Sequence, residues 1–353
     1  MTPAQPGPVL RGLTTVLPDH VWEQETLYQT LFSRHFGRHP KAHEIFQNAA
    51  VAKRHFALDL PTFLASQQTT ATRSDAYLQA AMQLGGQACR EALYKTGLIG
   101  SDIDFFVVAS CTGFAMPDLD VLLGPSLGLK RQVTRLTIGE TGSHAALPAI
   151  ARACDHVRAY PHHRALVLVV EICSANVQLD CIGENIVSAA IFGDGASALI
   201  IEGSDCAGPG LSVLAAGSST YFEAAAEMTY RFEPDGAHFH LGRRVPEVLA
   251  TGMAESIDTF LADQGLRRSD ITRWVHHPGG RLILDLIEKA LDFQADELAS
   301  SRRVLNQVGN LAASTVLFVL EESFRAKPLV PGERILMAGY GPGLGIEMLL
   351  MTA

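Results

Sequence analysis

The sequence predicts a layered α/β fold made of two related halves. From about residue 100, short apolar runs typical of buried strands alternate with segments whose apolar residues recur at helical spacing. Two similar segments, "GSHAA" at 142–146 and "GNLAA" at 309–313, each precede a helical pattern that leads into a buried strand. The chain has 353 residues, of which 47% are hydrophobic and 18% charged, so it is long enough to bury a large core.

The elements are predicted in order along the chain. We expect a flexible lead over residues 1–15 and mostly helical structure over 20–100, including a long helix that ends at Gly97. Continuous apolar runs predict buried strands, the last of them after a turn, within 102–111, 164–173 and 188–203. The segment "GYGPGLG" leads into the apolar "IEMLLM", a further strand, so it lacks the helix that a dinucleotide-binding loop requires.

The internal repeat divides the chain roughly into 1–205 and 206–353. Ser143 stands at a helix start in the first half, Asn310 holds the matching place in the second, and His277 follows a strand. A pseudo-twofold axis would bring the two helix starts together, and helix N-termini stabilise a thiolate, an alkoxide or an oxyanion. Ser and Asn are also favoured helix caps. Their combination with a His at matched positions favours acyl-transfer chemistry over capping alone.

The composition argues against several classes of function. The net charge is −9 without a Lys/Arg-rich run, which disfavours nucleic acid and anionic membrane surfaces as partners. Because we find no signal-peptide pattern and no bilayer-length apolar run, we expect a cytoplasmic protein whose six cysteines are reduced. The histidine pairs His162/His163 and His238/His240 lack partners at metal-ligand spacing, so no metal is expected.

Six motifs, in order from about residue 50 to the end, resemble the type III polyketide synthases, the chalcone and stilbene synthase family of the thiolase superfamily. The resemblance implies a thiolase-like five-layered αβαβα fold, a homodimer, and an acyltransferase of the polyketide synthase type without a bound cofactor. The motifs are "CTGFAMPDLD" (111–120), "SLGLKRQVTRL" (126–136), "AIFGDGASALI" (190–200), "HPGG" (277–280), "GNLAAS" (309–314) and "GYGPGLGIE" (339–347).

The resemblance also implies roles for individual residues. His277 and Asn310 match the catalytic His and Asn, which would polarise a thioester carbonyl and stabilise the enolate of a malonyl extender. Phe192 and Phe239 match two gatekeeper phenylalanines, and Met116 matches a Met that reaches into the partner subunit's cavity. Further positions that would line the cavity are Cys111, Thr112, Cys173 and Asn176.

The chain departs from the family pattern at the nucleophile, where Ser143 stands in place of Cys. A Ser hydroxyl is a weaker nucleophile than a thiol without a carboxylate to orient the His, and its ester is a less reactive acyl donor. Three explanations stay open: a natural Ser-dependent acyltransferase, hydrolase or cyclase without chain extension; a natural, slow condensing enzyme; or an engineered replacement of Cys. A non-catalytic subunit is a fourth reading, against which the retained His277 and Asn310 argue.

A second departure concerns the thioester carrier. Lys53 and Arg54, with Lys41, remain where the family holds the phosphates of coenzyme A, but Ile45 and Ala49 stand at expected basic positions. Lys53 and Arg54 are therefore the candidate carrier-binding residues, for acyl-CoA and malonyl-CoA or for acyl-carrier-protein thioesters. The reduced basic character favours acyl carrier protein more than in plant relatives.

Overall fold

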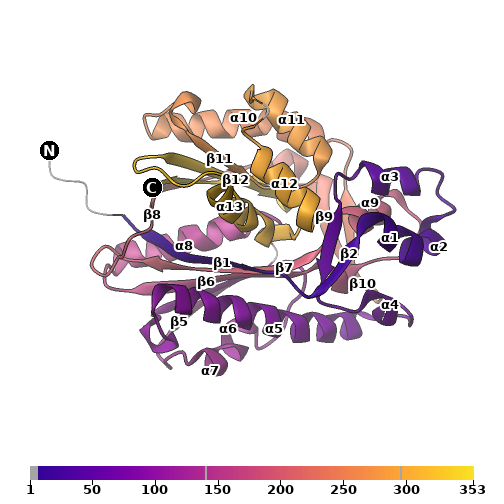
Figure 1. The fold of residues 1–353 in the computed structure, drawn as a ribbon, viewed down its shortest axis with the longest axis horizontal. Helices are drawn as coiled ribbons and strands as arrows, with labels where there is room; N and C mark the ends of the chain where they lie inside the picture. The colour runs from indigo at the N-terminus through magenta and orange to yellow at the C-terminus, as the bar shows by residue number, and fades with distance from the viewer. Residues whose placement is uncertain (1–6, 140, 295) are drawn as a thin grey trace.

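A computed structural model describes residues 7–139, 141–294 and 296–353. Nine strands pair in the order β11-β12-β13-β8-β1-β7-β6-β4-β5. The pairing is weakest between β1 (Val9–Val16) and β8 (Leu211–Thr220), where only two residue pairs are in register. The sheet therefore consists of two parts, one for each half of the chain, that meet at β1 and β8 (Figure 1).

The two parts repeat one topology. In the first, β4 (Phe105–Ala109) runs parallel to β6 (Arg164–Ile172), and β7 (Asp194–Glu202) is antiparallel to both β6 and β1. In the second, β11 (Arg273–His276) is parallel to β12 (Arg334–Gly341), and β13 (Gly345–Thr352) is antiparallel to both β12 and β8. The prediction of two pseudo-symmetric halves is confirmed; β5 (Thr134–Ile138) extends the first part only.

Helices form the other three layers. α8 (Ala146–Ala159) and α13 (Thr315–Ala326) share a buried core with both parts of the sheet and so lie between them. α5 (Thr70–Thr96) covers the outer face of the first part, and α10 (Val245–Asp263) with α11 (Arg281–Leu291) covers that of the second (Figure 1). The layer order is αβαβα, as the family resemblance implied.

The long predicted helix has clear end signals. At its start, the side chain and backbone of Thr69 exchange hydrogen bonds with Thr72 in a capping box. At its end, Gly97 adopts a left-handed conformation with φ of 72°, which only glycine adopts without strain. The predicted helix end at Gly97 is therefore confirmed.

The flexible lead was expected over residues 1–15, of which 1–6 lie outside the described residues. The expectation is wrong for residues 9–15, because residues 9–16 form β1 between the two parts of the sheet. β1 pairs along its length with β7, and its register shifts between Arg11 and Thr14. Gly12, with φ of +62°, lies in this bulge, where an added Cβ would stand 2.6 Å from Thr96 Cγ2. Because the bulge breaks the alternation of apolar and polar residues, the strand pattern is weak in the sequence.

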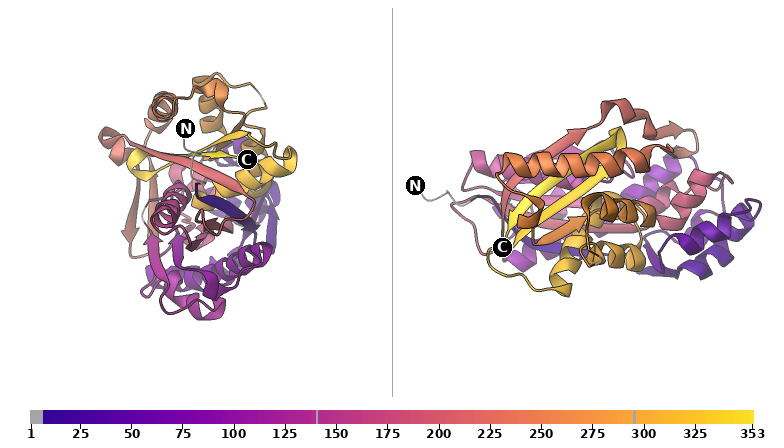
Figure 2. Two further views of the ribbon diagram at one scale, coloured as in Figure 1. Left: turned by 90° about the vertical axis from the view of Figure 1, so that its left-hand side faces the viewer. Right: turned by 90° about the horizontal axis from the view of Figure 1, so that it is seen from above.

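The remaining elements include a lobe beside the sheets, which extends beyond one end of them (Figure 2). The lobe contains the antiparallel pair of β2 (His20–Glu23) and β3 (Lys53–Phe56), so residues 20–100 are less helical than expected. None of the helices within the described segments is long and apolar enough to cross a membrane.

The remaining helices and strands have the following bounds: α1 (Gln24–Leu27), α2 (Ser33–Phe36), α3 (Ala42–Asn48), α4 (Leu60–Phe63), α6 (Leu119–Leu122), α7 (Gly124–Leu127), α9 (Gly183–Ile191), α12 (Ala299–Val308), β9 (Met228–Glu233) and β10 (Gly236–Leu241).

Candidate active site

Ser143 lies in the turn that joins β5 to α8. It precedes the first helical residue, Ala146, by three positions; the N-cap is Ala145, and the described residues contain no side-chain cap for this helix. The Ser143 hydroxyl is therefore not the N-cap that its sequence context allowed. The turn packs closely on the β12–β13 connection, because a Cβ on Gly341 would stand 3.1 Å from the Ser143 nitrogen.

Asn310 has a fixed carboxamide orientation. Its Oδ1 accepts from the Ala312 N–H at 2.9 Å and from the Thr315 hydroxyl at 3.2 Å, so the amide NH2 must point the other way. That NH2 donates to the Gly279 carbonyl at 3.3 Å. Since a carboxamide has two N–H donors, the second one remains to bind a substrate oxygen.

His277 is held beside Asn310 by the "HPGG" turn. Its backbone N–H donates to the Ala338 carbonyl at 2.9 Å, and its ring contacts Tyr340 edge-on with centroids 5.3 Å apart. The Tyr340 hydroxyl accepts from the Gly279 N–H at 2.9 Å, and a Cβ on Gly279 would stand 2.0 Å from that oxygen. Glycine is therefore required here, and the turn links His277 to the residue that Asn310 contacts.

The imidazole of His277 is uncharged near neutral pH. Burial, with a smaller contribution from the neighbouring His144, lowers its pKa to about 3. Burial likewise lowers the pKa of His144 to about 4. A neutral ring donates one N–H and is a weak base, so His277 suits hydrogen bonding to an oxyanion better than formation of an imidazolium pair.

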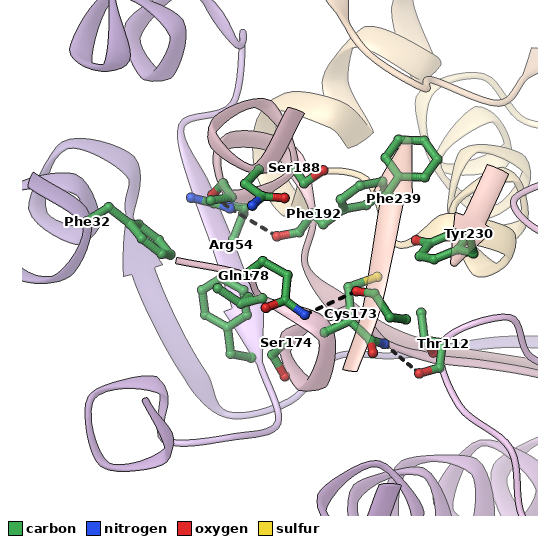
Figure 3. Close-up of a pocket in the computed structure, with 16 residues that line it drawn as sticks. Phe32, Arg54, Thr112, Cys173, Ser174, Gln178, Ser188, Phe192, Tyr230 and Phe239 are labelled. Carbon is green, nitrogen blue, oxygen red and sulfur yellow. Dashed lines mark hydrogen bonds between the residues drawn. The ribbon is translucent and has the colours of Figure 1, made fainter. Parts of the chain in front are cut away.

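Phe192 and Phe239, which the resemblance implied as gatekeepers, lie side by side at the predicted cavity (Figure 3). Their rings meet edge to face with centroids 6.2 Å apart, and Tyr230 packs against Phe239 at 5.1 Å. The enclosed space is about 40 Å³, much less than the ~300–1,000 Å³ of typical small-molecule sites, so an acyl chain requires these rings to move. The predicted pocket residues that line it are Thr112, Cys173, Asn176, Phe192 and Phe239.

A buried carboxylate, Glu171, lies directly beneath the cavity wall and was missed from the sequence. Both its oxygens accept from the Cys111 N–H at 3.1 Å, and Oε2 accepts from the Thr112 hydroxyl at 2.6 Å. Burial raises its pKa to about 7, and the hydrogen bonds only partly oppose this effect. The available signal was a charged residue inside the apolar run "RALVLVVEIC".

Cys173 lines the cavity, whereas Cys111, which was also expected there, does not, and neither thiol substitutes for a nucleophilic Cys at position 143. Burial, together with nearby negative groups, raises the pKa of both Cys111 and Cys173 well above the usual thiol value. Reactive cysteines instead occupy electropositive surroundings that favour the thiolate. Within the site, Ser143 therefore remains the candidate position for covalent catalysis.

Two groups of predicted residues lie away from this cluster. The Met116 side chain is 99% exposed and does not reach the cavity of its own chain. Lys53 is partly buried on β3, whereas Arg54 is 1% exposed and points inward, so its guanidinium is not presented to a carrier in solvent. At the substituted positions, Ile45 packs on the core and Ala49 is buried.

Members of the two histidine pairs contact carboxylates or another histidine. His238 contacts Asp235 at 2.9 Å, and His240 contacts Glu184 at 2.8 Å. Elsewhere, His163 hydrogen-bonds His156 at 2.9 Å. Within residues 7–139, 141–294 and 296–353, no group of three or more His, Cys, Asp or Glu residues is arranged to hold a metal ion.

Comparisons with known proteins agree with one another. Residues 4–206 match the model for the N-terminal domain of chalcone and stilbene synthases, and residues 215–353 match that for the C-terminal domain. The chain is 31% identical to 1,3,6,8-tetrahydroxynaphthalene synthase of Streptomyces peucetius subsp. caesius, over 98% of this chain and 93% of the relative. It is 32% identical to phloroglucinol synthase of Pseudomonas fluorescens, over 94% of this chain and 95% of the relative.

Solved structures show the same similarity. The chain matches PKS-I from the brown alga Ectocarpus siliculosus with a TM-score of 0.92 and 28% identity, over 100% of both chains. It matches 1,3,6,8-tetrahydroxynaphthalene synthase from Streptomyces coelicolor A3(2), a bacterial type III polyketide synthase, with a TM-score of 0.92 and 29% identity, over 98% of this chain and 99% of the other. Both the fold and the sequence of the two halves are thus shared with these proteins.

Proposed function

Because the chain belongs to the chalcone and stilbene synthase family, the type III polyketide synthases, we propose that it transfers an acyl group from a thioester to residue 143 and condenses it with malonyl units. The observation that carries this proposal is the pair of neutral donors, the free N–H of Asn310 and the His277 ring, held together by the Gly279 turn. Two neutral N–H donors that both bind the enolate oxygen would stabilise it without any metal or redox group.

The condensation step uses the donor pair directly. The C–C bond to the malonyl carboxylate breaks, carbon dioxide leaves, and the electron pair forms a thioester enolate. The enolate oxygen accepts hydrogen bonds from Asn310 and His277. The enolate carbon then attacks the acyl group on residue 143, whose side-chain oxygen departs and takes up a proton.

The loading step is the slower one in this mechanism. The Ser143 hydroxyl attacks the thioester carbonyl, its proton passes through His277 to the departing carrier thiolate, and the C–S bond breaks as the ester forms. His277 has a pKa of about 3 and is a poor proton acceptor. Loading at Ser143 is therefore expected to be slow, and Ser143→Cys should accelerate both loading and extension.

The second candidate is a natural Ser-dependent acyltransferase, hydrolase or cyclase without chain extension. It is favoured by Ser143 itself, whose hydroxyl does not cap α8. This enzyme would move a finished acyl chain to water, an alcohol or an amine. If Ser143 is instead an engineered replacement of Cys, a third result is expected, namely a stable acyl-serine that is neither hydrolysed nor extended.

Malonyl decarboxylation distinguishes these functions. The chain, Ser143→Ala and Ser143→Cys would each be incubated with malonyl-CoA, with and without an acyl-CoA starter, and analysed for carbon dioxide release, extended products and intact mass. We expect Ser143→Ala to retain decarboxylation, because the donor pair is intact, and Ser143→Cys to extend chains. Rapid starter hydrolysis by the Ser form, without carbon dioxide release by any form, would favour the second candidate.

The proposed assembly is a homodimer. Met116 is 99% exposed, and nearby Phe114 and Phe232 pack edge to face at 5.8 Å while remaining 58% and 60% exposed. An apolar group of this kind is typical of a protein interface. Light scattering should give a dimer mass, and Met116→Asp should weaken association. Because Arg54 points inward, the partly buried Lys53 is the remaining candidate of the two for binding the carrier phosphates. Coenzyme A and acyl carrier protein would both be tested as acyl donors.

A further inference from the structure

Arg54 is a buried cation that binds backbone rather than a carboxylate. Its guanidinium donates to the Ala189 carbonyl at 2.5 Å and to the Phe192 carbonyl at 3.0 Å; Figure 3 shows Arg54 beside Phe192. It also donates to Gln24 Oε1 at 2.7 Å. The rings of Phe46 and Phe56 lie 5.9 and 5.5 Å from the guanidinium carbon. Although burial lowers its pKa to about 9, Arg54 remains charged at neutral pH.

The backbone acceptors of Arg54 mark the C-terminal end of α9, where Phe192 is the cap residue. The last carbonyls of a helix have no partners within the helix and carry partial negative charge, so a cation there is favourable. A guanidinium can bind two carbonyls and a side chain at once because its donors form a rigid planar fork. Arg54 thereby holds the main chain that carries the gatekeeper Phe192.

The same end of α9 is joined to the catalytic Asn310. The Asn310 N–H donates to the Ile191 carbonyl at 2.8 Å, and the Asn310 carbonyl accepts from the Gly193 N–H at 3.0 Å. Gly309 precedes Asn310 with φ of +78°, and a Cβ there would stand 3.0 Å from Arg54 Cγ. The side chain of Arg54 thus contacts both segments of this bridge, one through its guanidinium and one through its aliphatic stem.

We propose that Arg54 is a positioning residue, which fixes the end of α9 against the Gly309–Asn310 segment and so places Phe192 and the Asn310 amide together. This differs from binding the phosphates of a carrier, the role expected from its place beside Lys53. Its catalytic consequence rests on the proposed function, because it requires that Asn310 act on the substrate. The structural part of the proposal does not depend on that function.

Arg54→Lys is the informative variant, because an ammonium keeps the charge but cannot span the three acceptors in one plane. Hydrogen–deuterium exchange with mass spectrometry would follow peptides covering 188–195 and 306–314. We expect exchange in both to accelerate at least about tenfold, since the bridge amides of Gly193 and Asn310 would open more often. For malonyl-CoA decarboxylation, we expect kcat to fall about 10- to 100-fold with KM little changed, as for a misplaced catalytic group.

Arg273→Lys is the matched control. Arg273 is similarly buried, pairs with Glu333 at 3.0 Å and donates to the Ser323 carbonyl, but it lies at the opposite end of β11 from His277. It should lower the unfolding temperature without changing exchange in 188–195 or 306–314, and without changing kcat. A purely structural role for Arg54 would make the two variants alike.

The outcomes separate the two levels of the proposal. Unchanged exchange in both peptides overturns it, and a raised KM with unchanged kcat would assign Arg54 to the carrier instead. Faster exchange with no decarboxylation even by the unmodified chain would uphold positioning and reject the proposed function. If Arg54→Lys does not fold, Gln24→Met removes one guanidinium acceptor while keeping the arginine, and absence of any shift in the two peptides would then overturn the proposal.

Discussion

Replacing Glu171 by glutamine should stabilise the protein at alkaline pH. Glu171 is 0% exposed, and its carboxylate accepts hydrogen bonds from neutral groups, among them the Cys111 N–H and the hydroxyls of Thr112 and Ser110. Its pKa of about 7 lies above the usual 4.5, so the folded protein binds a proton here that the unfolded chain has released between those pH values. Stability conferred by this site is therefore lost as pH rises from about 4.5 to 7.

The size of the effect follows from that difference in pKa. Each pH unit of difference corresponds to about 1.4 kcal/mol, so the ionised carboxylate lowers the free energy of unfolding by about 3 kcal/mol above pH 8. Glutamine carries no charge, but it loses part of the hydrogen bonding, which costs about 1 kcal/mol. We expect a net gain of about 2 kcal/mol at pH 8.5 and a loss of about 1 kcal/mol at pH 4.5.

Urea unfolding of both proteins between pH 4.5 and 9 measures this difference, and taking the difference removes effects common to both. Glu202→Gln is the matched control, because Glu202 is 1% exposed but is paired with Arg11 at 2.9 Å. Breaking that pair should destabilise the protein at pH 8.5, whereas Glu171→Gln should stabilise it at the same pH. A Glu171→Gln difference that does not change with pH would refute the reasoning.

Three further substitutions test particular contacts. Asn310→Asp keeps an oxygen that accepts from the Ala312 N–H but removes both amide donors. The kcat for malonyl decarboxylation should therefore fall by about 10³-fold or more, while the circular dichroism spectrum stays unchanged. A near-normal kcat would show that Asn310 does not bind the oxyanion. His276→Leu should raise the free energy of unfolding, measured with urea, by roughly 1–3 kcal/mol, because both ring nitrogens of His276 are buried without partners among the described residues. A lower free energy of unfolding would show that one of these nitrogens is hydrogen-bonded. Gly341→Ala places a Cβ 2.2 Å from His144 Nδ1, which forces the turn that carries Ser143 to move. Acylation of residue 143, detected by intact mass, should be abolished, and a second substitution, His144→Ala, should restore it. Unaffected acylation would mean that the turn relaxes freely.

Local signals in the sequence predicted much of the secondary structure. The helix that ends at Gly97 was predictable because its cap acts through neighbours in the chain. The buried strands Phe105–Ala109 and Arg164–Ile172 were predictable because strands covered on both faces are continuously apolar. The repeated segments before α8 and α13 indicated the two halves for the same reason, since each half repeats one local pattern.

Other features depend on segments far apart in the chain, and the expectations from sequence were wrong for two of them. Residues 9–16 form a strand because β7 and β8 supply hydrogen bonds on either side, and Arg54 turns inward because the end of α9 offers it carbonyls.

From the sequence alone, His277, Asn310 and Ser143 could be named as candidate active-site residues, and the repeated topology of the two halves could be predicted. The chemical states of these and neighbouring groups could be read only from the folded structure. Burial makes His277 neutral and keeps Glu171 partly protonated near pH 7, and packing orients the Asn310 amide. The reason is that a pKa and a hydrogen-bond direction depend on the solvent and the neighbours around a group, and folding brings these from distant parts of the chain.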